Sequence, residues 1–147
     1  MKIAIGADHA GFSAKEEMKT VLRALGHQVV DQGPANDLSV DYPDYAAKVA
    51  HAVTSGEADR GVLLCGTGIG MSIAANKVPG IRAAVIADEK SAELSRKHND
   101  ANIFCAGARM TPLPRIAESL KVWLQTPFEG GRHQNRVNKI SAMEAEG

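Results

Sequence analysis

The sequence lacks a cysteine framework, an excess of charge of either sign and a long apolar run. Its two cysteines, Cys65 and Cys105, are too few for a disulfide scaffold, and we expect an intracellular chain to keep both as thiols. The 17 basic and 17 acidic side chains cancel, so no global field attracts nucleic acid, and we expect no nucleic-acid partner. No apolar run approaches the roughly 18 residues that cross a bilayer, and no signal peptide opens the chain. We therefore expect a cytoplasmic protein that does not enter a membrane.

The composition is that of a folded globular protein. Hydrophobic residues make up 44% and charged residues 23% of the 147 residues, which is too apolar for a disordered chain. A chain of this length buries about two-thirds of its unfolded surface in one core. The sequence contains no internal linker and no repeat, so we predict a single domain over residues 1–147.

Short continuous apolar runs alternate along the chain with segments of helical spacing. Predicted strands cover residues 2–6, 27–33, 61–65, 81–86 and 102–106, and predicted helices cover residues 12–25, 43–55, 71–76, 91–98 and 112–124. Continuous apolar strands are typical of a parallel sheet that is buried on both faces. The alternation predicts an α/β fold, a doubly wound parallel sheet of about five strands with helices on both faces.

The tail over residues 127–147 is polar, but three apolar residues recur in it at helical spacing. They are Val137, Ile140 and Met143. A short amphipathic helix after a complete domain often buries its narrow apolar face elsewhere. We predict a C-terminal helical extension that packs on a partner subunit.

Ligands of an open parallel sheet bind outside the carboxyl ends of the strands. The residues that follow the predicted strands are Asp8 and His9, Cys65 with residues 66–70, Asp88, and Gly107 with Arg109. These positions are the first candidates for a functional site.

Residues 66–70 form a glycine-rich loop between a predicted strand and a predicted helix. Glycine stands at alternate positions, Gly66, Gly68 and Gly70, so a ligand can approach the backbone N–H groups closely. A helix start behind such a loop favours a bound or developing negative charge. The pattern matches neither the P-loop nor the dinucleotide fingerprint. The alternative is that the glycines only shape a tight strand-to-helix turn.

The two cysteines have different surroundings in the predicted fold. Cys65 ends a buried strand beside the glycine loop, whose N–H groups would favour a reactive thiolate. The alternative for Cys65 is a small apolar residue of the core. No comparable loop follows Cys105, which we interpret as a core residue.

Three further polar residues are candidates for proton transfer or ligand binding. Asp8 and His9 follow the first strand, where either side chain could bind a polar ligand or move a proton. Asp8 could equally cap the helix that follows it. His98 ends a predicted helix, and there the alternative role is an interaction with the last carbonyl groups.

Two arginines of the tail, Arg132 and Arg136, lie four residues apart on one face of the predicted helix. Two guanidinium groups that converge on one point suit a phosphate, although a solvated helix face would show the same spacing. We interpret Lys2, Lys15 and Lys19 as ordinary surface charges.

Six short segments, spread in order over nearly the whole chain, match one known family. They are DHAGF at 8–12, DYP at 41–43, CGTGIG at 65–70, SIAANK at 72–77, HND at 98–100 and EGGRH at 129–133. Together they resemble the type B ribose-5-phosphate isomerases, whose wider family includes isomerases of galactose 6-phosphate and allose 6-phosphate. The agreement of several motifs is far more specific than a single glycine loop.

The resemblance implies a Rossmann-like subunit that acts as a homodimer, with a tetramer left open. It implies an active site built from both subunits and an aldose–ketose isomerisation through an enediolate, without a cofactor or a metal. The implied substrate is a small phosphorylated sugar, and the resemblance favours a pentose over a hexose.

The resemblance also assigns roles to individual residues. Cys65 would move the proton between C1 and C2, Thr67 would lie near the sugar hydroxyls, and Asp8 and His98 would open the sugar ring. The implied substrate contacts are His9, Tyr42, Gly66, Gly68, Ile69, Gly70, Asn99, Arg109, Arg132 and Arg136. The resemblance leaves open that His98 and the tail arginines come from the neighbouring subunit. One branch of the family uses a glutamate as base where this chain has Met71, which cannot accept a proton.

Two other function classes remain open at this point. The glycine loop and the arginine pair would also suit a phosphosugar-binding regulatory domain without catalysis. The fold pattern alone would suit a flavodoxin-like electron carrier, but only 4% of the residues are aromatic and the loop is poor in hydroxyl groups.

Overall fold

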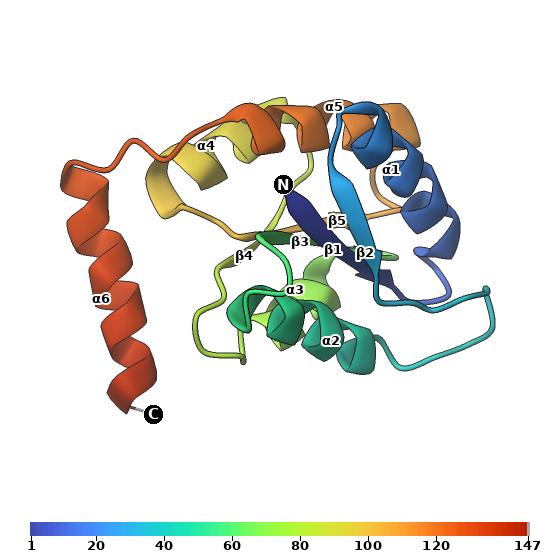
Figure 1. Ribbon diagram of the computed structural model, residues 1–147, viewed down its shortest axis with the longest axis horizontal. Coiled ribbons are helices and arrows are strands. Elements are labelled where there is room, and N and C mark those ends of the chain that lie inside the picture. Colours follow the sequence, from blue (N-terminus) through green and yellow to red (C-terminus); the bar gives the residue numbers. More distant parts are fainter. Residues whose placement is uncertain (147) are drawn as a thin grey trace.

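Five parallel strands form one sheet in the computed structural model, which describes residues 1–146 (Figure 1). The strands are β1 (Lys2–Ala7), β2 (Gln28–Asp31), β3 (Arg60–Cys65), β4 (Ala83–Val85) and β5 (Ile103–Gly107). Their order in the sheet is β2-β1-β3-β5-β4, and every neighbouring pair is parallel. The predicted doubly wound parallel sheet is confirmed. Gly147, the last residue of the predicted extension, lies outside the described residues.

Helices cover both faces of the sheet, as predicted. One face carries α1 (Phe12–Ala24), α4 (Glu89–Asn99) and α5 (Leu113–Gln125), and the other carries α2 (Tyr42–Thr54) and α3 (Ile69–Ala75) (Figure 1). The tail forms α6 (Arg132–Glu146), which stands beside the β4 edge of the sheet. Within the described part of the chain, no helix combines the length and apolarity that crossing a membrane requires.

Alternate residues of the strands enter two separate cores. On one face, residues such as Ile5 and Leu64 pack with α1 and α5, and Trp123 packs edge-on against Phe104 with ring centroids 5.7 Å apart. Cys105 belongs to the opposite core under α2 and α3 and is fully buried, which confirms its interpretation as a core residue. Burial, with a smaller contribution from Cys65, raises the pKa of the Cys105 thiol far above its ordinary value.

A crevice is expected where neighbouring strands send their helices to opposite faces of a sheet. The chain leaves β1 into α1 on one face, and it leaves the adjacent β3 into α3 on the other. The carboxyl ends of β1 and β3 therefore lie at the switch point of the sheet, and they are the ends followed by Asp8 and by the glycine loop.

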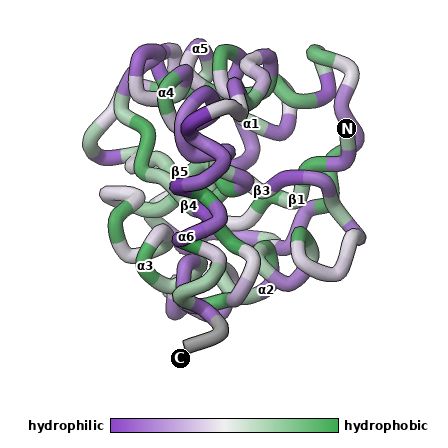
Figure 2. The backbone as a smooth tube through the Cα atoms, turned by 90° about the vertical axis from the view of Figure 1, so that its left-hand side faces the viewer, coloured by the Kyte–Doolittle hydropathy of each residue, from purple (hydrophilic) through white to green (hydrophobic). Residues whose placement is uncertain are grey.

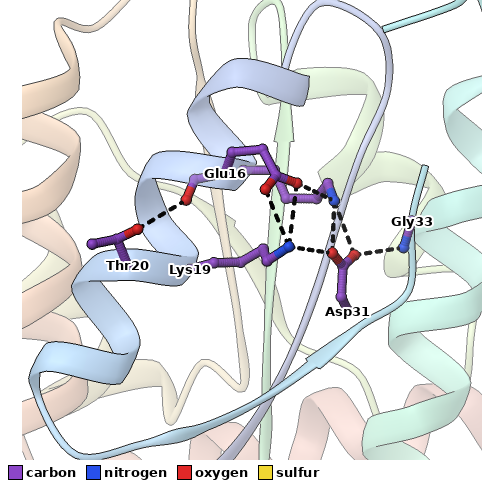
Figure 3. A network of polar contacts seen from close by, with 6 residues as sticks. Glu16, Lys19, Thr20, Asp31 and Gly33 are labelled. Carbon is purple, nitrogen blue, oxygen red and sulfur yellow. Dashed lines mark hydrogen bonds and ion pairs between the residues drawn. The ribbon is translucent and has the colours of Figure 1, made fainter. Parts of the chain in front are cut away.

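Lys15 is not a surface charge, so this prediction is wrong. Its side chain is fully buried, and its Nζ lies 2.9 Å from both carboxylate oxygens of Asp31 at the end of β2. Asp31 also accepts hydrogen bonds from Lys19 and from the Gly33 N–H group, and Glu16 joins the cluster (Figure 3). Burial alone would raise the pKa of Asp31, but the hydrogen bonds from the two lysines lower it overall.

The Asp31→Asn substitution tests whether this ion pair stabilises the fold. We expect the free energy of unfolding at pH 7 to fall by about 2 kcal/mol, less than for a fully enclosed pair, because the Lys15 charge loses one of its two carboxylate partners, keeps Glu16 at 3.1 Å, and Asp31 is partly exposed. The pKa of Asp31 is lowered in the folded chain, so its stabilisation is present above the ordinary carboxyl value of 3.8 and is lost as the pH falls through the folded value. Urea unfolding at a fixed protein concentration, repeated from pH 7 downwards, measures both effects.

Glu93→Gln is the matched control, because Glu93 pairs with Lys90 and Lys97 at the surface. We expect this variant to change the free energy of unfolding by less than about 0.5 kcal/mol. Equal losses for the two variants would contradict a special role of the buried pair.

Candidate active site

The glycine loop of residues 66–70 lies directly on the backbone of neighbouring segments. A Cβ at Gly107 would lie 2.5 Å from the carbonyl carbon of Thr67, and a Cβ at Gly11 would collide with the Leu64 carbonyl group. Gly68 has φ +81°, a conformation that favours glycine. The start of α1, the end of β3 and the end of β5 therefore meet at the loop without side chains between them.

The Cys65 sulfur lies inside this loop. Its Sγ accepts a hydrogen bond from the Gly68 N–H group at 3.0 Å, and only 5% of the residue is exposed. A backbone donor that points at the sulfur stabilises negative charge on it. Cys65 belongs to the core cluster, as the apolar alternative predicted, and it also faces the loop as the reactive alternative predicted.

Backbone donors remain at the beginning of α3. The Ile69 N–H group donates to Thr67 Oγ1 at 3.2 Å, so this hydroxyl closes the loop. The N–H groups of Gly70 and Met71 form no hydrogen bond within the described residues. These two donors can bind a negatively charged oxygen close to the Cys65 sulfur.

Two predicted contact residues flank the loop on either side. A Cβ at Gly70 would lie 2.6 Å from Cε1 of Tyr42, so the Tyr42 ring occupies the place that a side chain would take. The Arg109 side chain lies along Gly66, and its backbone N–H group donates to the Gly66 carbonyl at 3.0 Å. The fold thus brings Tyr42 and Arg109 to the same loop as Cys65.

Asp8 and His9 lie at the carboxyl end of β1, next to β3. The Oδ1 atom of Asp8 accepts the Gly11 N–H group at 3.0 Å, so Asp8 orders the turn before α1, but the N-cap residue of that helix is Gly11 and not Asp8. Asp8 is 8% exposed, and its Oδ2 atom forms no hydrogen bond to the described residues. The Nδ1 atom of His9 accepts the Val40 N–H group at 3.3 Å.

The other predicted site residues lie near the amino ends of the strands, opposite the carboxyl ends where Cys65 lies. They are His98 and Asn99 at the end of α4, and Arg132 and Arg136 on α6. In a parallel sheet, a helix that follows one strand returns to the amino end of the next, so α4 ends beside the start of β5. The rise along β3 from Gly61, the partner of Ile103, to Cys65 is about 13 Å. One chain therefore does not bring this second group to the Cys65 loop.

His133 joins the second group, although no pattern in the sequence assigns it a role. Its ring stacks on His98 with centroids 4.3 Å apart, and it is buried while Arg132 and Arg136 are exposed. Burial, followed by the charges of His98 and Arg132, lowers the pKa of His133. The lowered pKa favours the neutral form of the His133 ring, which stacks on His98.

The cluster of His98, Glu129 and His133 has the residue types of a metal site. Their ligand atoms all lie within 4.8 Å of one another, and His98 Nε2 lies 3.9 Å from Glu129 Oε1. The two imidazole planes differ by only 16°, and the lone pair of a ring nitrogen lies in its ring plane. Two stacked, parallel rings do not point at one ion, so this geometry does not fit a metal centre.

Three parts of the site went unpredicted: the Gly11 contact, the Val40 donor and the stacked His133. A glycine just before a helix is a signal for close backbone approach and could have identified Gly11. The Val40 N–H group and the His133 ring carry no such signal, because each acts through a long-range contact with a residue of another segment.

Comparisons with known proteins give one family over nearly the whole chain. A family model described as Ribose/Galactose Isomerase matches residues 3–140. Ribose-5-phosphate isomerase B of Escherichia coli (strain K12) is 49% identical over 143 residues, which cover 97% of this chain and 96% of that protein. The solved structure of ribose-5-phosphate isomerase B from Clostridium thermocellum has a TM-score of 0.98 at 51% identity, covering 99% of both chains. A structure from Mycoplasma genitalium with bound ribulose-5-phosphate has a TM-score of 0.94 at 40% identity and covers 99% of this chain and 97% of that one.

Alkylation of the native chain should distinguish the two cysteines. We expect iodoacetamide at pH 8 to modify Cys65, where a backbone donor stabilises the charged sulfur, and to leave the buried, protonated Cys105 intact. Peptide mass mapping identifies the modified residue. Cys65→Ala should remove the reactivity of the native chain, and unfolding in guanidinium should expose Cys105. Modification of Cys105 in native Cys65→Ala would contradict this assignment.

Proposed function

Since this chain belongs to the ribose/galactose isomerase family, we propose that it interconverts ribose 5-phosphate and ribulose 5-phosphate with Cys65 as the base. The resemblance found in the motifs is confirmed by the family model and by the relatives. The chain is an isomerase, and the roles of its residues form our proposal.

The observation that carries this proposal is the Cys65 sulfur under the glycine loop. A proton beside a sugar carbonyl is weakly acidic, so its removal needs a base and a group that stabilises the developing oxyanion. The Cys65 sulfur accepts the Gly68 N–H group, and the Gly70 and Met71 N–H groups have no other partner in the described chain. Base and oxyanion donors therefore lie within one turn of backbone.

We assign the isomerisation steps as follows. The Cys65 thiolate takes the proton from C2 of the open-chain sugar, and the electron pair moves to the carbonyl oxygen to give an enediolate. The loop N–H groups stabilise this oxygen, and Thr67 lies near the hydroxyl groups. The proton of the 2-hydroxyl group moves to the oxygen on C1, and Cys65 returns the carbon-bound proton to C1, which gives the ketose. The reaction is redox-neutral within the sugar, so it needs no external electron acceptor.

Ring opening and phosphate binding fall to the remaining residues. Asp8 and His98 would transfer protons to and from the ring oxygen and the anomeric hydroxyl. His9, Arg132 and Arg136 would bind the phosphate, because charge-assisted hydrogen bonds from guanidinium groups suit it. The backbone of Gly66, Gly68, Ile69 and Gly70, with the side chains of Tyr42, Asn99 and Arg109, would complete the substrate contacts.

This assignment requires a second copy of the chain. His98, Asn99 and the two arginines lie near the amino ends of the strands, whereas Cys65 and Asp8 lie at the carboxyl ends. We propose a homodimer in which each subunit's α4 and α6 complete the other's glycine-loop site, and a tetramer stays open. A cytoplasmic location also stays a prediction.

The surface around α6 supports this dimer. Ile140 is 43% exposed and Met143 is 68% exposed, so the apolar face of α6 is only partly covered in one chain. A groove of about 840 Å³ runs between α6 and the β4 edge and includes Ile81 and Ala83. Figure 2 looks onto this side, where α6 lies in front of β4. A second copy would bury both the helix face and the groove.

An assay of ribose 5-phosphate, with ribulose 5-phosphate detected as product, tests the proposed function. The family description also includes galactose, so allose 6-phosphate and galactose 6-phosphate serve as the hexose comparison. We expect the highest kcat/KM with the pentose. Binding of sugar phosphate without any product would favour the regulatory domain instead.

Cys65→Ala should abolish isomerisation and also the exchange of the C2 proton with solvent. The variant keeps the glycine loop and the phosphate-binding residues, so we expect it to bind ribose 5-phosphate with a Kd within about threefold of wild type. Solvent deuterium incorporation followed by NMR measures the exchange, and calorimetry measures the binding. Full activity of Cys65→Ala would exclude the assigned base.

Mixing inactive variants should reveal the shared site. Equal amounts of Cys65→Ala and His98→Ala subunits, exchanged and re-associated, would form heterodimers with one intact site, so we expect about a quarter of the wild-type activity. Cys65→Ala mixed with Asp8→Ala is the control. It should stay inactive, because one chain supplies both Cys65 and Asp8 to a site, so each site of the heterodimer lacks one of them. Equal results for the two mixtures would contradict a site built from two subunits.

A further inference from the structure

His9 receives a hydrogen bond that determines how its ring can act. The backbone N–H group of Val40 points at Nδ1 of His9 with 3.3 Å between the nitrogen atoms. His9 follows β1, whereas Val40 ends the long loop before α2, so two separate segments meet here. A backbone N–H group can only donate, and Nδ1 must therefore accept.

We infer that His9 is held as the Nε2–H tautomer and presents this N–H group to the substrate as a neutral hydrogen-bond donor. A neutral imidazole has one donor nitrogen and one acceptor nitrogen, so acceptance at Nδ1 leaves the proton on Nε2. A proton on Nδ1 would face the Val40 N–H group and break the contact. His9 thus donates a directional hydrogen bond to the substrate, and the arginines supply the positive charge for the phosphate.

The loop that carries Val40 is attached to the body of the protein at its beginning. Gln32 N–H donates to the Ile5 carbonyl, Ala7 N–H donates to the Gly33 carbonyl, and Gly33 N–H donates to Asp31. Asp31 is held in turn by the two lysines of α1 (Figure 3). At its other end the loop leads directly into α2, which packs on the sheet. Both ends of the segment are therefore fixed, and the Val40 donor has a defined position.

This inference rests on the proposed function for the identity of the ligand, an oxygen atom of a sugar phosphate, but not for the tautomer. His9 is exposed at the carboxyl ends of the strands, on the side of the sheet that carries the Cys65 loop. An Nε2–H donor there can bind a phosphate or hydroxyl oxygen whatever reaction follows.

Long-range proton–nitrogen NMR of the ligand-free protein at pH 8 tests the tautomer directly. We expect the His9 ring to show a protonated Nε2 and an unprotonated Nδ1, and the His9→Gln spectrum identifies its signals among the five histidines. A protonated Nδ1 in the neutral ring would overturn the inference. This readout depends on no substrate and no activity.

A pair of amide variants tests the role in binding. The amide nitrogen of Gln can occupy the position of Nε2, whereas that of Asn lies near Nδ1. We expect His9→Gln to keep the KM for ribose 5-phosphate within about threefold, and His9→Asn to raise it about tenfold, with kcat less affected in both. His51 on the exposed face of α2 supplies matched controls, and His51→Gln and His51→Asn should both behave as wild type.

Equal or better binding by His9→Asn than by His9→Gln would overturn the inference. Loss of binding in both variants would also overturn it, because an amide donor at the Nε2 position would then be insufficient. If wild type itself does not turn over ribose 5-phosphate, the proposed function fails, while the NMR result still decides the tautomer.

Discussion

The Gly68 N–H group can reach the Cys65 sulfur only because three backbone segments meet with no side chain between them. Gly11 lets the start of α1 lie on the end of β3, and Gly107 lets β5 lie against Thr67. The loop is clamped further by hydrogen bonds from Ala108 to the Cys65 carbonyl and from Arg109 to the Gly66 carbonyl. Donors that are held in place before the reaction need no reorganisation when charge develops. The close packing of glycine backbones is therefore the basis of the proposed chemistry.

The topology of the sheet divides the proposed catalytic groups between the carboxyl and the amino ends of its strands. Residues that directly follow a strand lie at the carboxyl ends of the strands, whereas residues at the end of a returning helix lie near the amino ends. Cys65 and Asp8 belong to the first class, and His98 belongs to the second. No change in side-chain rotamer moves a residue between the two ends of the strands, and for this reason the proposed site includes a second chain. In the proposed dimer, dissociation of the subunits would abolish activity, and activity would therefore depend on protein concentration.

Local patterns in the sequence predicted most of the elements and the end of the sheet where the glycine loop lies. Continuous apolar runs predicted the buried strands, and the glycines at 66–70 predicted a loop that exposes its backbone. Single-sequence patterns carry no information on which strands are neighbours, so the position of β5 between β3 and β4 went unpredicted. For the same reason the separation of His98 from Cys65 became visible only in the fold.

The wrong interpretation of Lys15 shows that the spacing of residues along a helix can indicate burial more reliably than the charge of a side chain. Lys15 lies three residues before Met18 and seven before Leu22, so it shares the buried face of α1. Its position on this face is the signal for burial, but the interpretation as a surface residue followed its charge instead. The charge is stable there because Asp31, at the end of β2, lies within 2.9 Å. Asp31 also orders the turn at Gly33, from which the chain runs on to Val40 and His9. A pair that stabilises the packing of α1 on the sheet therefore also fixes the beginning of the loop whose Val40 N–H group contacts His9.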